Sequence, residues 1–160
     1  MHKIGDKAPN FATTTESGEK FRLSSFKGKK MFLYFYPKDN TTGCQQEACS
    51  IRDRYEVFEK SDIPVFGVSG GDTKSHQSFK NKNNLPFPLL MDEDFEIAKL
   101  YDVYKKKSMY GKEYMGIERT TFLIDEKGKI EGIFGGPEGI EKVNTKEHAD
   151  QVISFWKLKL

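Results

Sequence analysis

The two cysteines of this 160-residue chain, Cys44 and Cys49, are its best candidates for chemistry. Residues 31–36 form a continuous apolar and aromatic run that predicts a short buried strand, and Pro37 ends it. Asp39, Asn40 and Thr41 then supply turn and cap chemistry before Gly43 and residues that favour a helix. We therefore expect Cys44 in the first turn of that helix, where free amides and the positive end of the helix dipole stabilise a thiolate. Such a cysteine is a nucleophile at neutral pH.

The spacing of the two cysteines limits how they can be used. Positions i and i+5 of a helix lie on different faces, with Cα atoms roughly 8–9 Å apart, which exceeds the reach of about 7 Å for a disulfide. A bond between Cys44 and Cys49 therefore requires the first helical turns to unwind. The spacing is neither a CxxC motif nor a zinc pattern, and it fits a resolving cysteine on a segment that can unfold. The alternatives are two unrelated thiols, or a Cys44 that is buried and inert.

The residues around Cys44 resemble the active site of the peroxiredoxins. The stretch PKDNTTGC, which begins at Pro37, is similar to their PxxxTxxC motif, and a second cysteine five residues later is similar to the bacterioferritin-comigratory-protein (PrxQ) subfamily. The resemblance extends through GDKAPNF near the N-terminus and GIERTTFLID at 116–125, and so covers nearly the whole chain. Thr42 and Thr120 depart from it, standing where the subfamily often has proline and serine. Neither departure removes a group that the chemistry requires.

This resemblance implies a thiol-dependent peroxidase with a thioredoxin-like fold. The thiolate of Cys44 attacks hydrogen peroxide or an organic hydroperoxide and becomes a sulfenic acid. Cys49 then condenses with the sulfenic acid, and the resulting disulfide is reduced by thioredoxin or a similar dithiol protein. The implied enzyme needs no cofactor and no metal. The resemblance also suggests a monomer and leaves a dimer open.

Four further positions are predicted to assist the cysteine. The hydroxyl of Thr41 and the amides of Gly43 and Cys44 are placed to stabilise the charge that moves from sulfur to the leaving oxygen. The resemblance assigns a fixed positive charge to Arg119, which would otherwise be read as a surface arginine at the start of a strand. Pro37 is expected to shield the thiolate and shape the loop, besides ending the strand.

Two other functions use the same residues differently. A dithiol-disulfide oxidoreductase or thiol sensor would act on protein partners through the same reactive cysteine, and would need an exposed groove for peptides. A binding domain without catalysis would carry the cysteines as ordinary thiols. Oxidation of the reduced protein within seconds by equimolar hydrogen peroxide, at micromolar concentration, would favour the peroxidase.

Composition argues against several other classes of protein. The 26 basic and 24 acidic residues are mixed along the chain and leave a net charge of +2, a weak case for nucleic acid. No stretch approaches the 18–20 or so apolar residues of a membrane helix. The N-terminal residues lack the apolar region of a secretory signal, so we expect a protein that is cytoplasmic or already processed. In a reducing cytosol, two cysteines are more often catalytic than structural. The three histidines, His2, His76 and His148, lack the local spacing of metal ligands.

Strands and helices are expected to alternate along a single domain, residues 1–160. This order predicts an α/β fold with a mixed central β-sheet flanked by helices and an N-terminal β-hairpin. The first half of the chain is expected to form a hairpin of 11–15 and 20–23, a strand at 31–36, one helix from 42 through 58, a strand at 62–69, and a helix to 83 that Asp72 or Thr73 caps. The second half is expected to form an extended segment at 85–92, a helix through 97–103 that Asp92 or Asp94 caps, a charged loop at 105–114, a hairpin of 119–125 and 129–134, and a final helix that Thr145 caps.

Overall fold

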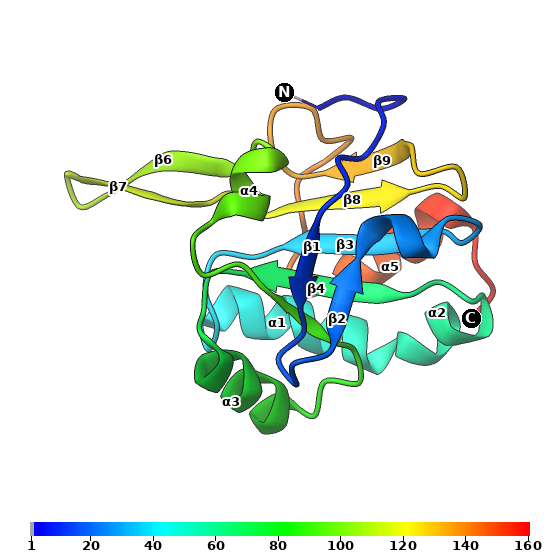
Figure 1. Cartoon of the computed structure of the whole chain (residues 1–160), viewed down its shortest axis with the longest axis horizontal. Helices are drawn as coiled ribbons and strands as arrows, with labels where there is room; N and C mark the ends of the chain where they lie inside the picture. The colour runs from blue at the N-terminus through cyan, green and yellow to red at the C-terminus, as the bar shows by residue number, and fades with distance from the viewer. Residues whose placement is uncertain (1) are drawn as a thin grey trace.

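The computed structural model describes residues 2–160, which fold around a five-stranded mixed sheet (Figure 1). Its strand order is β5-β4-β3-β8-β9. β3 (Met31–Phe35), β4 (Val65–Ser69) and β5 (Leu89–Met91) run parallel, whereas β8 (Thr120–Ile124) and β9 (Ile130–Phe134) are added antiparallel. The predicted α/β fold with a mixed central sheet is confirmed.

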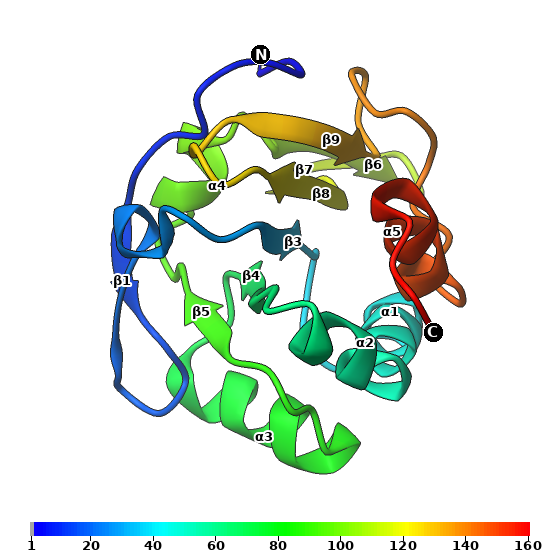
Figure 2. The ribbon, with the colours of Figure 1, turned by 90° about the vertical axis from the view of Figure 1, so that its right-hand side faces the viewer.

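The central strand β3 is buried on both of its faces. Its even-numbered side chains pack against α1 (Thr42–Asp53), α2 (Tyr55–Lys60) and α5 (His148–Trp156), which cover one face of the sheet (Figure 2). Its odd-numbered side chains pack under the N-terminal segment and α4 (Glu96–Leu100) on the other face. A strand covered on both faces must be apolar at every position, which explains the unbroken apolar run. Among the described residues, no helix has the length and apolar character needed to cross a bilayer.

The helix that carries the cysteines is shorter than expected. We predicted one helix from 42 through 58, but α1 ends at Asp53 and α2 begins at Tyr55. Between them Arg54 adopts φ −114° and ψ 9°, and its amide donates to the carbonyl of Ile51 at 3.2 Å instead of continuing the α-helical pattern. The apolar stripe that predicted a single helix continues across the break, because both helices pack on the same core.

A second correction concerns the segment between α4 and β8. In place of the expected loop at 105–114, β6 (Tyr104–Met109) and β7 (Lys112–Ile117) form an antiparallel hairpin that projects from the body (Figure 1). Tyr110 and Gly111 turn it with φ of +51° and +77°, and two positive φ values are typical of a type I′ hairpin turn. Most of its side chains are exposed, so neither strand shows the apolar alternation of a half-buried strand.

The side chains of two aspartates accept hydrogen bonds from the first turns of helices, as predicted. At the start of α3 (Thr73–Asn83), the carboxylate of Asp72 accepts a hydrogen bond from the amide three residues later, at 2.8 Å. Asp92 accepts from two amides in the first turn of α4, each at 2.9 Å. The expected cap of the last helix is wrong, because Thr145 lies before α5 and its hydroxyl donates to Oε1 of Gln46, at 2.9 Å.

Main-chain hydrogen bonds from other segments cover parts of both edges of the sheet. The predicted N-terminal hairpin forms from β1 (Ala12–Thr14) and β2 (Lys20–Arg22), followed by the short 3-10 helix Leu23–Phe26. Beyond β1 the chain bridges to β5, where the amide of Glu16 donates to the carbonyl of Leu89 at 2.9 Å. At the opposite edge, residues near positions 5 and 140 pair with β9.

Candidate active site

Cys44 lies in the first turn of α1, just beyond the end of β3, as the sequence predicted. The first α-helical hydrogen bond of α1 runs from the amide of Gln45 to the carbonyl of Thr41, at 2.8 Å. The amides of Gly43 and Cys44 precede it and have no carbonyl acceptor within the helix. They form the positive end of the helix dipole around the sulfur.

Arg119 brings a fixed positive charge to the same sulfur. It directly precedes β8, the antiparallel neighbour of β3, and its Nη2 lies 3.4 Å from Sγ of Cys44. A Cβ at position 43 would stand 3.1 Å from that nitrogen, so Gly43 allows the guanidinium to approach the start of the helix. On the other side, Gly135 has φ +80°, and a Cβ there would overlap the carbonyl oxygen of Arg119. Two glycines therefore help to set where the arginine sits.

Glu47 is a site residue that the sequence analysis missed. It is fully buried one helical turn after Cys44, and its Oε1 accepts a hydrogen bond from Nη1 of Arg119 at 2.6 Å. Within residues 2–160 its Oε2 has no hydrogen-bond partner. Burial raises the pKa of Glu47 to about 7, although the charge of Arg119 opposes this shift. Its spacing of three residues from Cys44, which puts both side chains on one face of a helix, was the available signal.

His148 closes the buried end of this cluster as a neutral group. Its Nε2 lies 2.7 Å from the hydroxyl of Thr121, and its Nδ1 lies 2.7 Å from Oε1 of Gln151. Because Oε1 can only accept, Nδ1 carries the proton and Nε2 accepts from Thr121. Burial lowers the pKa of His148 to about 4. Glu47, whose Oε2 is 3.7 Å away, therefore gains no charge partner from this histidine.

The loop between β3 and α1 is held by a buried polar cluster. Asp39 accepts hydrogen bonds from Tyr36 at 2.6 Å, from Ser75 at 2.7 Å and from Nδ1 of His76 at 2.6 Å. Burial opposes the ionisation of both members of the Asp39 and His76 pair. The hydrogen bonds outweigh it, so the pKa of Asp39 is lowered and the pKa of His76 is raised. The sequence offered Asp39 only as a turn residue.

Two predicted residues of this loop lie near the cysteine without contacting its sulfur by a hydrogen bond in the described structure. The hydroxyl of Thr41 donates to the carbonyl of Lys38 at 3.0 Å, and the residue is exposed. Pro37 is half-buried and directly follows Tyr36 at the end of the buried run. The roles of Thr41 and Pro37 toward a substrate remain predictions.

Both cysteines are free thiols, in different surroundings. Cys44 is only 1% exposed, whereas Cys49 is half-buried and lies 3.7 Å from Oδ1 of Asn83 on α3. A side chain as closed as Cys44 suits a small substrate better than a peptide. This geometry disfavours an oxidoreductase that acts on protein disulfides in the folded state.

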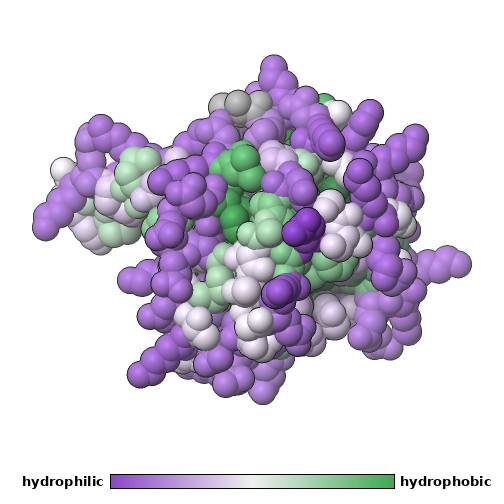
Figure 3. Space-filling view, viewed as in Figure 1, coloured by the Kyte–Doolittle hydropathy of each residue, from purple (hydrophilic) through white to green (hydrophobic). Residues whose placement is uncertain are grey.

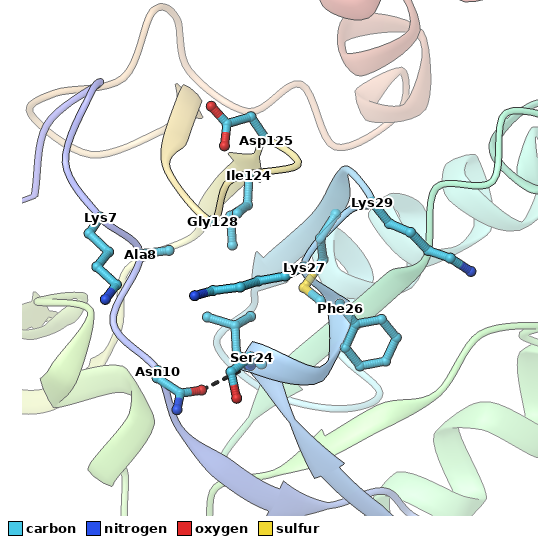
Figure 4. Close-up of a pocket in the computed structure, with 12 residues that line it drawn as sticks. Lys7, Ala8, Asn10, Ser24, Phe26, Lys27, Lys29, Ile124, Asp125 and Gly128 are labelled. Atoms are coloured by element: carbon cyan, nitrogen blue, oxygen red, sulfur yellow. Dashed lines mark hydrogen bonds between the residues drawn. The ribbon is translucent and has the colours of Figure 1, made fainter.

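A cavity lies away from this site, at the opposite end of β3 (Figure 4). It measures about 150 Å³ and is lined by the N-terminal segment, the 3-10 helix and the ends of β3 and β8. Lys27 reaches across it, while Lys29 points away and pairs with Asp62 at 3.1 Å. The cavity contributes nothing to the surroundings of Cys44. Among the described residues, no cluster of three or more histidine, cysteine or acidic side chains could hold a metal.

Comparison with known proteins agrees with this geometry. Residues 4–133 match the model described as the AhpC/TSA family. The chain is 46% identical over 151 residues to a putative peroxiredoxin bcp of Coxiella burnetii, covering 94% of this chain and 96% of the other. It resembles a mutant structure of PrxQ from Xylella fastidiosa, with TM-score 0.88, 34% identity and coverage of 98% and 97%. A bacterioferritin comigratory protein of Xanthomonas campestris, studied for alkyl peroxide reduction, gives TM-score 0.82, 34% identity and coverage of 92% and 90%.

Proposed function

The chain belongs to the AhpC/TSA family and is a thiol-dependent peroxidase with a thioredoxin-like fold, and we propose that Cys44 is the cysteine that attacks the peroxide. The thiolate sulfur bonds to the terminal oxygen, the O–O bond breaks, and the other oxygen leaves with the electron pair and takes up a proton. The products are a sulfenic acid and water or an alcohol. The observation that carries this proposal is the 3.4 Å approach of Arg119 to the sulfur at the start of α1.

The surrounding donors would act on the charge as it moves. Negative charge starts on sulfur and ends on the leaving oxygen, so fixed donors near both atoms lower the barrier. Arg119 and the amides of Gly43 and Cys44 already face this region. The hydroxyl of Thr41 completes the set once it turns from the Lys38 carbonyl to a bound peroxide. Pro37 keeps water from the sulfur by covering the start of the loop.

Cys49 would resolve the oxidised enzyme. Its thiol sulfur attacks the sulfenic sulfur of Cys44, a disulfide forms, and the hydroxyl leaves as water. Because the two residues are five positions apart on α1, the first turns of this helix must unwind before the sulfurs can bond. The disulfide would therefore sit in a distorted and reducible segment, and thioredoxin or a similar dithiol protein would reduce it.

The substrates we infer are hydrogen peroxide and organic hydroperoxides, since alkyl peroxide reduction was studied in the Xanthomonas relative. We also infer a cytoplasmic enzyme of one domain, a monomer with a dimer as the alternative, that acts without nucleic acid or membrane. Mixed charge and two free cysteines support these inferences. Sedimentation of the reduced and oxidised forms would decide between monomer and dimer.

Two cysteine variants test the assignment. Cys44→Ser should consume no peroxide in an assay coupled to thioredoxin, its reductase and NADPH. Cys49→Ser should react once and yield a sulfenic acid that dimedone traps, and the oxidised wild type should show a 44–49 bridge by mass spectrometry without reduction. Wild-type turnover by Cys44→Ser would show that the nucleophile lies elsewhere.

A further inference from the structure

The β6–β7 hairpin exposes much of the apolar surface that this protein presents. Met109, Tyr110, Tyr114 and Met115 are 57%, 98%, 44% and 50% exposed. The space-filling view shows this arm on the left, with apolar side chains among hydrophilic ones (Figure 3). An arm that contributes so little to the core has no need of exposed methionine and tyrosine for folding. Such residues are enriched where proteins bind one another.

The strand register separates the two faces of this arm. Lys107 lies opposite Tyr114, and Met109 lies opposite Lys112. Residues directly opposite each other, and those two positions along a strand, share a face. We call this face the lysine face; its exposed or half-buried side chains are those of Lys105, Lys107, Met109, Lys112 and Tyr114. It carries three lysines and no acidic residue.

The opposite face of the arm has a different character. It presents Lys106, Ser108, Glu113 and Met115. Lys106 and Glu113 form an ion pair at 2.7 Å, so the charges of this face are balanced. The opposite face exposes one large apolar side chain against two on the lysine face and has no net charge, so changes to it serve as a control for changes to the lysine face.

The lysine face is the one directed toward the active site. Lys107 is half-buried, and its ammonium interacts electrostatically with both Arg119 and Cys44. Its stem lies over Gly116, since a Cβ there would stand 3.5 Å from Cδ of Lys107. β7 then ends at Ile117, two residues before Arg119. A protein resting on this face would have its own surface near Cys44 and Arg119.

We propose that the lysine face docks an acidic dithiol protein that reduces the Cys44–Cys49 disulfide. This inference rests on the proposed function and adds the surface that the reductant recognises. Lys105 pairs with Asp102 at 3.2 Å and Lys107 interacts electrostatically with Glu118, whereas Lys112 forms no ion pair among the described residues. The face therefore keeps an excess of positive charge, which favours an acidic partner, and its exposed methionine and tyrosine favour an apolar spot beside the partner's cysteines. A small dithiol would need none of these contacts.

The docked reaction balances as two thiol–disulfide exchanges. A thiolate of the partner attacks the sulfur of Cys49, forms a mixed disulfide and releases Cys44 as a thiolate. The second thiol of the partner, after losing its proton, attacks the partner's own sulfur and releases Cys49, which takes up a proton. The partner leaves as a disulfide, and the peroxidase is again fully reduced.

The experiment compares the two faces of the arm with two reductants. Lys112→Glu/Tyr114→Ser alters the lysine face, and Lys106→Glu/Met115→Ser alters the opposite face. With thioredoxin as the limiting reductant, we expect the lysine-face variant to raise KM at least about tenfold and to lose most of the salt dependence of the wild type. The opposite-face variant should stay within about twofold. With dithiothreitol, all three proteins should turn over alike.

The possible failures are distinguishable from one another. Equal KM values for the two variants would overturn the docking surface while leaving the peroxidase assignment intact. Loss of turnover with dithiothreitol in the lysine-face variant would also overturn it, since the defect would then lie in the peroxide step. If the wild type uses dithiothreitol but not thioredoxin, the acidic dithiol partner is wrong. If the lysine-face variant only converts a dimer into a monomer in sedimentation, the face binds a second copy instead.

Discussion

Nη1 of Arg119 donates to the buried carboxylate of Glu47 at 2.6 Å, although the two residues are 72 positions apart in the chain. Glu47 lies one turn beyond Cys44 on α1, so this helix carries both the proposed nucleophile and the carboxylate that orients Arg119. Nη2, the second terminal nitrogen of the guanidinium, is then free to face Sγ of Cys44, at 3.4 Å. Arg119 is thus held in a fixed direction before any substrate arrives.

Replacing Glu47 should slow the peroxide step without removing any group that touches the peroxide. Glu47→Gln keeps the shape of the side chain but turns a charge-assisted hydrogen bond into a weaker one, so Arg119 loses its orientation. We expect the second-order rate of Cys44 with hydrogen peroxide to fall about 10- to 100-fold. Stopped-flow oxidation of the reduced protein measures it. Glu56→Gln, in an exposed ion pair on α2, is the control and should react like the wild type.

The same substitution should change the pH dependence of stability. The pKa of Glu47 is about 7 in the folded protein against an ordinary value of 4.5. Its contribution to stability is therefore full below pH 4.5 and is lost as the pH rises through 7. The unfolding free energy of Glu47→Gln minus that of the wild type should therefore rise by roughly 2–3 kcal/mol when the pH is raised from 5 to 8. Urea unfolding of both proteins at the two pH values measures this. A constant difference would mean that Glu47 titrates normally.

Replacing Arg119 should slow the reaction of Cys44 with peroxide. Arg119→Met removes a charge that faces the reacting sulfur, and we expect the peroxide rate to fall about 10²- to 10³-fold. It also leaves the buried Glu47 unpaired, which threatens folding. The double variant Glu47→Gln/Arg119→Met should recover stability, as thermal unfolding would show, and stay slow. Recovery of the rate in the double variant would mean that Arg119 serves only to neutralise Glu47.

Gly135 offers a way to displace Arg119 through the backbone. Gly135→Ala puts a Cβ against the carbonyl of Arg119 and occupies φ +80°. Gly128→Ala is the matched control, because its φ is +82° with open space around the Cβ. Each should lose about 1 kcal/mol or more in unfolding free energy from the left-handed conformation. Only Gly135→Ala should also slow peroxide reduction; an equal effect of both variants would contradict this.

The pair of Asp39 and His76 should stabilise the active-site loop within a limited pH range. The raised pKa of His76 gives stability that is full below its ordinary value of 6.5 and is lost as the pH rises through the folded value. The lowered pKa of Asp39 contributes stability that is full at pH values above its ordinary pKa of 3.8 and is lost as the pH falls through the folded value. His76→Phe should therefore cost roughly 3 kcal/mol near pH 6 and less at pH 9. Denaturation at the two pH values tests this, with His2→Phe, at a half-buried histidine outside the Asp39 cluster, as the control.

Local features of the chain could be predicted from the sequence. Cys44 follows a strand, a turn and a helix start that are adjacent in sequence, and nearby residues alone decide each of these. Asp72 was predicted as a helix cap for the same reason. The mixed sheet followed from the alternation of strands and helices, which leaves few arrangements for the connections.

Features that depend on distant residues could not be predicted. In the sequence, Glu47 has the features of any helix residue and Asp39 those of any turn residue. Their roles come from contacts with Arg119, next to β8, and with His76 on α3, which are distant in the chain. The β6–β7 hairpin escaped prediction because its lysines carry no apolar alternation. Thr145 looked like a cap, but its hydroxyl instead donates to Gln46, which lies 99 positions away.

The covered edges of the central sheet bear on how this protein behaves at high concentration. Main-chain groups of β5 and β9 are already paired with other segments of the same chain, through Glu16 on one side and Gly5 on the other. Open strand edges are the usual template on which copies of a protein stack into fibrils. The partial unfolding of α1 that we propose for each catalytic cycle can therefore occur without exposing strand edges to a neighbouring molecule.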